Sequence, residues 1–223
     1  MTTVPEDAPS RLELQKADRR RQLLDAATRL IAERGYLGVR LEDLGSAAGI
    51  SGPAIYRHFP NKDAVLVELL VGISRRLLEG GTHVTRSART SEEALTGLVD
   101  FHVDFALSES DLIRIQDRDL QNLPAEAERE VRQMQRQYVE IWVRVLLELD
   151  PTLNAADART EAHAVFGLIN STPHSADPEN PEHTRQILQR MSLSALGALN
   201  PLSSAARQRS LTARACRPNL QDS

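Results

Sequence analysis

Among the side chains of this sequence that could do chemistry, the basic ones are in excess near the N-terminus. Residues 10–62 carry ten lysines and arginines against six acidic residues, a net charge of +4. Residues 63–200 carry −9, and the whole chain of 223 residues carries −4. The total alone argues against a nucleic-acid-binding protein, but a basic block joined to an acidic body indicates two parts with different partners. The alternative is chance clustering of charges on solvated helix faces.

Sequence signatures of catalysis are missing. There is no glycine-rich phosphate loop, no cysteine–histidine pair and no convincing carboxylate dyad. His102, His163 and His174 lack the spacing of metal ligands, so we expect no metal and no cofactor. The single cysteine, Cys216, fits a reducing compartment. The sequence has neither a signal-peptide layout nor an apolar run near the roughly 20 residues of a membrane span, so a cytoplasmic protein is expected. Because catalytic signatures are missing, we also expect that it is not an enzyme.

The elements that must position these side chains are predicted to be helices. Apolar residues recur at helical spacing, and no run of alternating β-branched residues predicts a strand. We therefore expect an all-α fold of about nine helices, three or four short ones followed by five longer ones. Asn61, Asn154 and Asn180 predict helix starts, whereas Gly80-Gly81 and Pro173 predict helix ends. The Ser/Ala/Arg-rich residues 201–223 are expected to form a disordered tail.

Residues 39–66 have the pattern of two helices joined by a three-residue turn at Gly49. The apolar positions that would lock the two helices together are Leu41, Leu44, Ala48, Ile50, Ile55 and Phe59. This is the helix-turn-helix unit, whose second helix can enter a DNA major groove. An ordinary corner of two helices has the same spacing, so the pattern alone leaves both interpretations open.

The stretch from about residue 17 to residue 70 resembles the DNA-binding domain of the TetR family of bacterial regulators. The residues that carry the resemblance are Leu44, the turn Ala48-Gly49-Ile50-Ser51, the segment Tyr56-Arg57-His58-Phe59, and Asn61-Lys62-Asp63 with Leu66. The resemblance implies a three-helix helix-turn-helix DNA-binding domain at residues 16–62, after a flexible N-terminal arm at residues 1–15. It also implies a larger helical ligand-binding and dimerisation domain at residues 63–200.

The family's recognition helix presents its exposed positions to the major groove. Here those positions are Gly52, Pro53, Ala54, Tyr56, Arg57 and His58. Arg57 suits the O6 and N7 atoms of guanine, or else a phosphate. Lys62 stands at a helix N-terminus and is expected to hold a phosphate, with a solvated lysine as the alternative. Arg19 and Arg20 are expected to reach phosphates or the minor groove, unless they belong to a solvated first turn.

One position departs from the family pattern. The family usually has Ser or Thr at the start of the second helix, where it caps the helix and binds a phosphate; this chain has Arg40. Arg40 can replace the phosphate contact, but a guanidinium has no acceptor with which to cap N–H groups. The sequence leaves open whether Arg40 reaches DNA or pairs with Glu42 or Asp43.

The resemblance further implies that the long C-terminal helices enclose a ligand chamber and that the last two pair with a second subunit. The chamber is expected among Phe101, Phe105, Ile115, Tyr138, Trp142, His163 and Phe166. The dimer interface is expected at Phe166, Gly167, Ile187, Met191, Ala195 and Ala198. The alternatives are ordinary core packing for most of the first set and intramolecular packing for the second. A polar run at Arg114, Gln116, Arg118 and Asp119 would receive an anionic group or form a salt-bridged surface.

The resemblance thus implies a ligand-responsive, DNA-binding transcriptional regulator that acts as a homodimer. We expect a repressor that leaves a palindromic operator in double-stranded DNA when a small hydrophobic or amphipathic effector binds, with no membrane partner. The alternative is a helical homodimeric interaction module without DNA binding.

Overall fold

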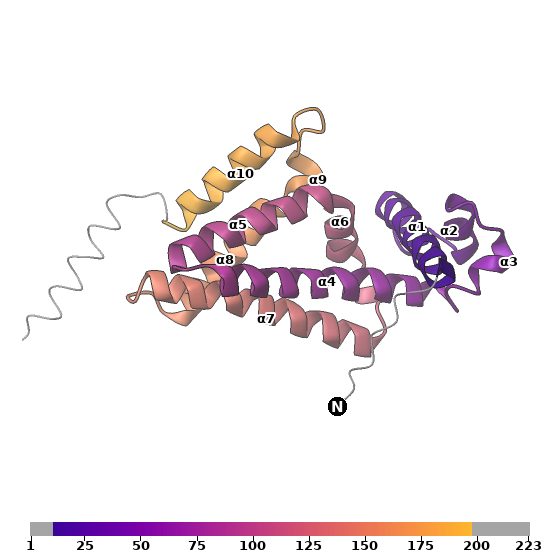
Figure 1. Cartoon of the computed structure of the whole chain (residues 1–223), viewed down its shortest axis with the longest axis horizontal. Helices are drawn as coiled ribbons and strands as arrows, with labels where there is room; N and C mark the ends of the chain where they lie inside the picture. The colour runs from indigo at the N-terminus through magenta and orange to yellow at the C-terminus, as the bar shows by residue number, and fades with distance from the viewer. Residues whose placement is uncertain (1–10, 198–223) are drawn as a thin grey trace, which may run out of the picture. The chain divides into compact units, whose positions relative to one another are not determined.

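The computed structural model describes residues 11–197, and the predicted tail, most of the predicted arm and Ala198 lie outside that range. Within it all regular structure is helical, which confirms the all-α prediction (Figure 1). The longer helices are α1 (Arg11–Arg34), α4 (Lys62–Ser87), α5 (Ser91–Ser108), α6 (Ser110–Asp119), α7 (Ala125–Leu149), α8 (Ala155–Ile169) and α10 (Pro181–Ala195). The short ones are α2 (Leu41–Ala47), α3 (Gly52–Ile55), the 3-10 turn Leu120–Asn122 and α9 (Thr172–Ser175). No helix in the described range is long and apolar enough to cross a membrane.

The chain divides into two compact units. The first comprises the described residues as far as Arg75 and a later segment, Asp111–Gln133. The second comprises Arg76–Ser110 and the described residues from Met134 onward. The helices α4 and α7 each contribute to both units, and the first unit extends beyond residues 16–62 because it includes most of α6.

The first unit is built around the helix-turn-helix predicted from residues 39–66. The side chains of Leu44, Ile55 and Phe59 are almost completely buried between the helices. Gly45 allows the close crossing, because a Cβ atom there would lie 3.2 Å from the Ile55 side chain. The turn is closed by Gly49 at a φ of +69°, a left-handed conformation that costs glycine little. Two short helices are thereby held at a fixed crossing.

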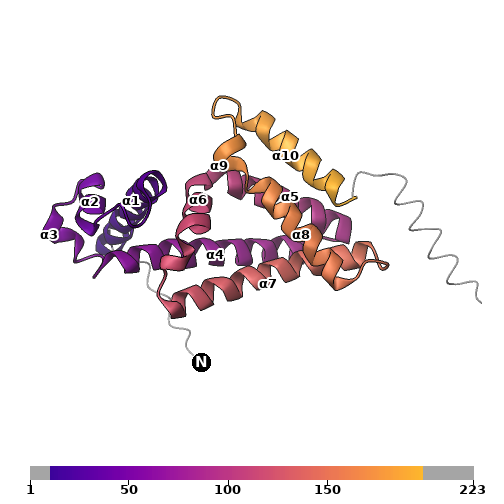
Figure 2. The same ribbon diagram turned by 180° about the vertical axis from the view of Figure 1, so that it is seen from behind.

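In the second unit, α10 packs along α5 and α8 (Figures 1 and 2). Polar contacts add to the packing: the Gln189 amide donates to Asp100 at 2.9 Å, and Arg185 pairs with Asp104. The Thr172 hydroxyl donates to the carbonyl of Ala106 at 3.1 Å. These contacts tie the last described helix to the middle of the unit.

The prediction that α4 ends at Gly80-Gly81 is wrong, since the helix continues to Ser87. A Cβ atom on Gly80 would lie 2.1 Å from the Phe101 ring, and one on Gly81 would lie 2.5 Å from the Tyr138 ring. The two glycines therefore serve packing. They leave room for two aromatic rings to lie directly on the helix backbone, which offsets the roughly 1 kcal/mol that each glycine costs a helix.

Candidate nucleic-acid interface and ligand site

The segment that contains α3 exposes the predicted DNA-facing side chains to different degrees. Pro53 and Arg57 are exposed, and the Tyr56 side chain is 51% exposed. Ala54 and His58 are half-buried, and Gly52 begins the helix. Buried Ile55 and Phe59 hold the opposite side of the segment in the core. The resulting surface has one large aromatic and one arginine at its centre.

Arg57 keeps its guanidinium available. Among the described residues it has neither an ion pair nor a side-chain hydrogen bond, and its backbone N–H donates to Ala54 at 3.2 Å. A free guanidinium on a rigid backbone can make two parallel hydrogen bonds to one guanine edge or to one phosphate. This side chain therefore has the chemistry expected of a base reader.

Tyr56 has a partner of its own, because its hydroxyl donates to the carboxylate of Glu42 on α2. The hydrogen bond lowers the pKa of Glu42 and raises the pKa of Tyr56. A phosphate contact by Tyr56 would have to compete with this carboxylate. This pairing could not be predicted from the sequence, since the two residues lie fourteen positions apart.

At the start of α2, the contacts of Arg40 and Asp43 bear on whether Arg40 pairs with an acidic neighbour. The Asp43 carboxylate accepts the backbone N–H of Arg40 at 2.8 Å, so Asp43 supplies the only half of a capping box that this sequence can make. The exposed guanidinium of Arg40 forms no ion pair with Glu42 or Asp43 in the described part of the chain. It is therefore available to an external anion.

The Arg20 side chain contacts other residues of the first unit. Its guanidinium donates to Glu68 at 2.7 Å and to the carbonyl of His58 at 2.9 Å, and it lies 4.3 Å from the centre of the Phe59 ring. It thus fastens α1 to α4 and to the end of the recognition segment. Arg19 is exposed and contacts only its neighbour Gln22 at 3.0 Å among the described residues. Of the two arginines expected to reach DNA, Arg20 thus has partners on α4 and in the recognition segment, whereas Arg19 has none beyond α1 among the described residues.

Lys62 also has internal partners in place of the expected phosphate. Its Nζ donates to the carbonyls of Tyr36 and Val39, both at 2.8 Å, and lies 4.1 Å from the centre of the Tyr36 ring. The Tyr36 hydroxyl in turn donates to Asp63. Burial and this hydrogen bond raise the pKa of Tyr36. The ammonium fixes the α1–α2 loop to the start of α4, a role that sequence spacing does not reveal.

The polar side chains near the end of α6 also contact other parts of the first unit, to which most of α6 belongs. Arg118 donates to the carbonyls of Ile31 and Ala32 at the end of α1, at 2.5 and 3.3 Å. The neighbouring Asp119 is buried and accepts the backbone N–H of Tyr36 at 3.4 Å. Arg118 and Asp119 also form an ion pair at 2.9 Å, in agreement with the salt-bridged alternative, and both side chains satisfy backbone groups of α1 and the loop after it.

In the second unit, four of the residues in or beside the predicted chamber form one aromatic cluster: His102, Tyr138, Trp142 and Phe166. The rings of His102 and Phe166 stack with centroids 4.9 Å apart, and Trp142 meets Phe166 edge-on at 5.0 Å. His102 was not among the residues predicted to line the chamber, and its spacing predicted only that it is not a metal ligand. Its position in the sequence is a signal for the cluster, since His102 lies one residue from Phe101 and three from Phe105, both of which were predicted to line the chamber.

His102 is buried and neutral. Its Nε2 lies 3.1 Å from the Asn170 Oδ1 and its Nδ1 lies 3.0 Å from the Tyr138 hydroxyl. Because the amide oxygen can only accept, Nε2 carries the proton and Tyr138 donates to Nδ1. Burial lowers the pKa of His102 to about 4 and raises the pKa of Tyr138. The buried Trp142 Nε1–H forms no hydrogen bond of standard geometry among the described residues, but it lies close enough to the Tyr138 hydroxyl to lower the pKa of Tyr138 against the larger effect of burial.

The remaining chamber residues are not all brought together. Phe101 lies against Gly80, and the Phe105 ring lies 6.1 Å from His102, so both are near the cluster. His163 is exposed, although its ring lies 6.2 Å from Phe166. Ile115 is buried and belongs to the first unit, whereas the aromatic cluster belongs to the second.

The residues expected at the dimer interface leave apolar surface on α8 and α10. Met191 is 47% exposed, Ala195 and Gly167 are exposed, and Ile187 and Phe166 are half-buried. A Cβ atom on Gly167 would meet nothing within 4 Å, so no described segment of this chain covers that position. The fold leaves this face to solvent or to a partner.

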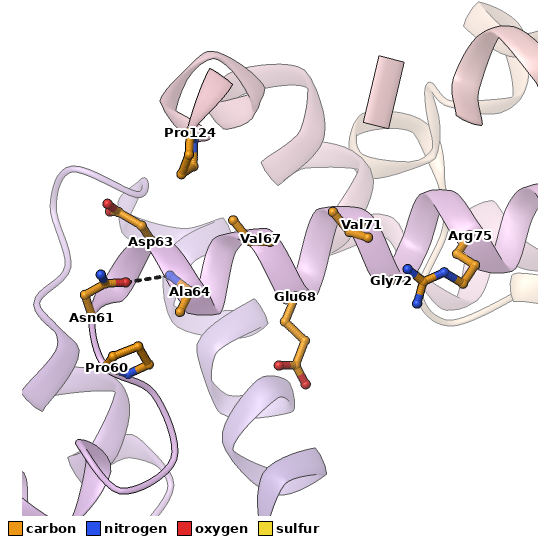
Figure 3. A pocket seen from close by; sticks show the side chains of 10 residues that line it. All are labelled: Pro60, Asn61, Asp63, Ala64, Val67, Glu68, Val71, Gly72, Arg75 and Pro124. Atoms are coloured by element: carbon orange, nitrogen blue, oxygen red, sulfur yellow. Dashed lines mark hydrogen bonds between the residues drawn. The ribbon is translucent and has the colours of Figure 1, made fainter. Parts of the chain in front are cut away.

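A hollow of about 630 Å³ lies on the first unit along α4 (Figure 3). Val67 and Val71 face Pro124 across it, and the Asn61 side chain caps the helix by accepting from the N–H of Ala64 at 2.8 Å. Arg75 at its end pairs with Glu130 at 3.5 Å. The hollow lies on the first unit, and its lining combines apolar residues with charged ones such as Asp63 and Glu68.

Comparison with known proteins agrees with the fold. Residues 23–69 match the model of bacterial regulatory proteins of the tetR family, and residues 88–199 match the tetracyclin repressor-like C-terminal domain. The fatty acid metabolism regulator protein of Bacillus subtilis is 24% identical over 161 residues, 71% of this chain and 83% of that regulator.

Two solved structures have the same fold. One is the ketosteroid transcriptional regulator KstR2 of Mycobacterium tuberculosis, with a TM-score of 0.72, 23% identity, and coverage of 81% of this chain and 94% of that one. The other is AibR in complex with isovaleryl coenzyme A and operator DNA, with a TM-score of 0.67, 18% identity, and coverage of 78% and 97%.

A helix-turn-helix with a free arginine on its exposed side, followed by a helical unit with an aromatic interior, defines a DNA-binding regulator of the one-component type. The chain belongs to the TetR family and is a ligand-responsive transcriptional regulator.

Proposed function

We propose that this chain acts as a homodimeric repressor that reads a palindromic operator through α3 and the turn after it. The observation that carries the proposal is Arg57, an exposed guanidinium without an internal partner, on a segment anchored by Ile55 and Phe59. Arg40 and Arg19 supply phosphate contacts beside it. Arg20 and Lys62 act indirectly, because they position the recognition segment and the loop before α2.

A palindromic operator has two half-sites, and each requires the recognition segment of a separate subunit. Half-sites one helical turn apart place the recognition segments about 34–36 Å from each other in successive major grooves. The exposed apolar surface of α8 and α10, with Met191, Ala195 and Gly167, supports a second copy as its partner. Burying such a surface in a two-fold interface removes apolar area from water in both subunits at once.

We propose an amphipathic effector that carries an apolar chain and a hydrogen-bond acceptor such as a thioester or ketone carbonyl. The aromatic cluster offers stacked apolar faces, and the Trp142 Nε1–H offers a buried donor with no acceptor in standard geometry within residues 11–197. A donor left unpaired in the interior costs about 1–3 kcal/mol, which a carbonyl on the effector would recover. The relatives named for fatty acids, ketosteroids and isovaleryl coenzyme A support this class.

The test is DNA binding by purified protein to palindromic sites upstream of its own gene, measured by fluorescence anisotropy. Arg57→Ala is expected to lose about 1–3 kcal/mol of specific binding, roughly tenfold or more, while binding to unrelated DNA changes little. Arg29→Ala, which removes an exposed arginine of α1 outside the recognition segment, is the matched control and should change neither. A dimer that binds no DNA at all would instead support an interaction module.

A further inference from the structure

A second hollow, of about 310 Å³, lies in the second unit where α4 ends and α5 begins. Three arginines line it: Arg86 in the last turn of α4, Arg89 just after that helix, and Arg144 on α7. The apolar side chains of Ile141 and Val145 form another part of its wall. Three guanidinium groups therefore border one small, partly apolar space.

None of these three guanidinium groups has an ion pair or a side-chain hydrogen bond with another residue of the described range. Arg136 and Arg190 of the same unit also lack such a partner in the described range, whereas Arg76 pairs with Glu109 at 2.9 Å and Arg159 with Glu140 at 2.6 Å. The hollow is thus a place where arginines gather without their usual carboxylates.

The two carboxylates near the hollow are occupied by neutral donors. Glu148, which lines the hollow, accepts the Ser91 hydroxyl at 2.8 Å. Glu93 accepts the backbone N–H of Arg89 at 2.9 Å, and its own backbone N–H donates to the Thr90 hydroxyl at 3.1 Å. These hydrogen bonds hold both carboxylates in place while the arginine side chains remain uncommitted. The lining residues themselves carry three positive charges against one negative charge.

We propose that this hollow is an anion site that binds a phosphate or diphosphate group. Guanidinium groups present planar pairs of N–H donors that match phosphate oxygens, and these three arginines are exposed, so an anion can reach them from solvent. A space of about 310 Å³ suits a phosphoryl group and its linker better than a complete large cofactor. The same chemistry fits the phosphates of a nucleotide-bearing effector and a free inorganic anion.

The chemistry of this site differs from that of the aromatic cluster, because the site would bind a negatively charged group whereas the cluster would bind the apolar part of an effector. It goes beyond the proposed function because neither operator binding nor the effector's apolar chain requires it. Its existence would let the second unit respond to an anion.

The experiment is isothermal titration calorimetry of the full-length protein with pyrophosphate and, separately, with coenzyme A, at constant ionic strength. Arg144→Gln is expected to weaken binding of either anion about tenfold, the loss typical of one charged hydrogen-bonding partner. The matched control is Arg136→Gln, which removes an exposed arginine two turns earlier on α7, outside the hollow, and should bind like the wild type. Arg57→Ala should also keep its anion binding, because that residue lies in the other unit.

If coenzyme A binds more tightly than pyrophosphate, and Arg144→Gln loses the binding of both, the phosphate that the site takes belongs to a nucleotide-bearing effector. Binding of pyrophosphate alone, lost in the same variant, would identify a free anion. The proposal is overturned if neither anion binds, or if Arg136→Gln weakens binding as much as Arg144→Gln does. Operator binding by Arg144→Gln, measured without anion, should remain at the wild-type level, so a failure of the anion site is distinguishable from a failure of DNA binding.

Discussion

The two compact units treat their interior polar groups in opposite ways. In the first, charged side chains such as Arg20, Lys62 and Asp119 are drawn into contact with carbonyls, a carboxylate and a backbone N–H. In the second, the buried polar cluster of His102, Tyr138 and Asn170 is neutral and satisfies itself. The first unit should therefore be sensitive to the loss of a charge, and the second to the gain of one.

The largest expected effect tests the loss of a charge from the first unit. Lys62→Met keeps the length of the side chain but leaves the carbonyls of Tyr36 and Val39 without their donor. Charge-assisted hydrogen bonds contribute about 1.5–3 kcal/mol each, so the free energy of unfolding should fall by about 3 kcal/mol. Urea denaturation measures this, with Lys16→Met on the exposed side of α1 as the control.

The same variant distinguishes a structural lysine from a phosphate-binding one. If Lys62 contacts a phosphate, its removal should lower the salt dependence of DNA binding by about 0.9 in the log–log slope. We expect that slope to stay unchanged for the folded variant. Unchanged stability together with a smaller slope would contradict the internal role.

The next effect tests the gain of a charge in the second unit. Because His102 has a pKa of about 4 in the fold and about 6.5 unfolded, the unfolded chain binds more protons between these values. His102 therefore contributes stability that is fully present above about pH 6.5 and is lost as the pH falls toward 4.

Between about pH 7.5 and about pH 5 the loss should be about 2 kcal/mol. His102→Gln cannot take up this proton, so the stability difference between wild type and variant should shrink by that amount over the same range. Parallel stability curves for the two proteins would show that His102 is not held neutral by the fold.

A smaller effect sharpens the comparison by changing packing in the second unit without changing any charge. Gly80→Ala would drive a methyl group into the Phe101 ring, and overpacking costs about 1–3 kcal/mol. Alanine returns up to about 1 kcal/mol of helix propensity, so a net loss of about 1 kcal/mol is expected in thermal unfolding. Gly72→Ala on the same helix meets nothing within 4 Å and should stabilise the protein.

The smallest effect concerns DNA affinity. Glu42→Gln removes a negative charge beside α3 and weakens the acceptor that holds the Tyr56 hydroxyl. We expect operator binding to tighten about two- to threefold at low salt, with the gain screened as salt is raised. Glu33→Gln, an exposed acid near the end of α1, provides the charge-matched comparison. Equal tightening in both variants would assign the effect to net charge alone.

Local signals in the sequence predicted the helix starts well. Asn61, Asn154 and Asn180 all accept backbone N–H groups in the first turns of α4, α8 and α10, as their positions indicated. The helix-turn-helix was predictable because its spacing, its turn glycine and its apolar positions all lie within about thirty residues of one another. These features depend on neighbours along the chain.

Features that depend on distant neighbours were not predictable. Gly80-Gly81 looked like a helix end because the rings of Phe101 and Tyr138 that use the space are 21 and 57 residues away. Residues 14–16 of α1 precede the stretch that resembles the family, and they are exposed, with Leu14 at 52%, so no buried face marks them as helical in the sequence. For Arg20 and Lys62, a basic residue near DNA-binding helices has the same sequence signature whether it binds phosphate or a carbonyl.

The contact between Arg118 and the end of α1 bears on how regulators of this kind can be recombined. An exchange of effector domains at the gap between residues 69 and 88 would bring in a foreign α6. Such a chimera would lose the side chains that bind the carbonyls of Ile31 and Ala32 and the N–H of Tyr36. Its DNA-reading half would then lack part of its own scaffold, unless residues 118 and 119 were transplanted with it.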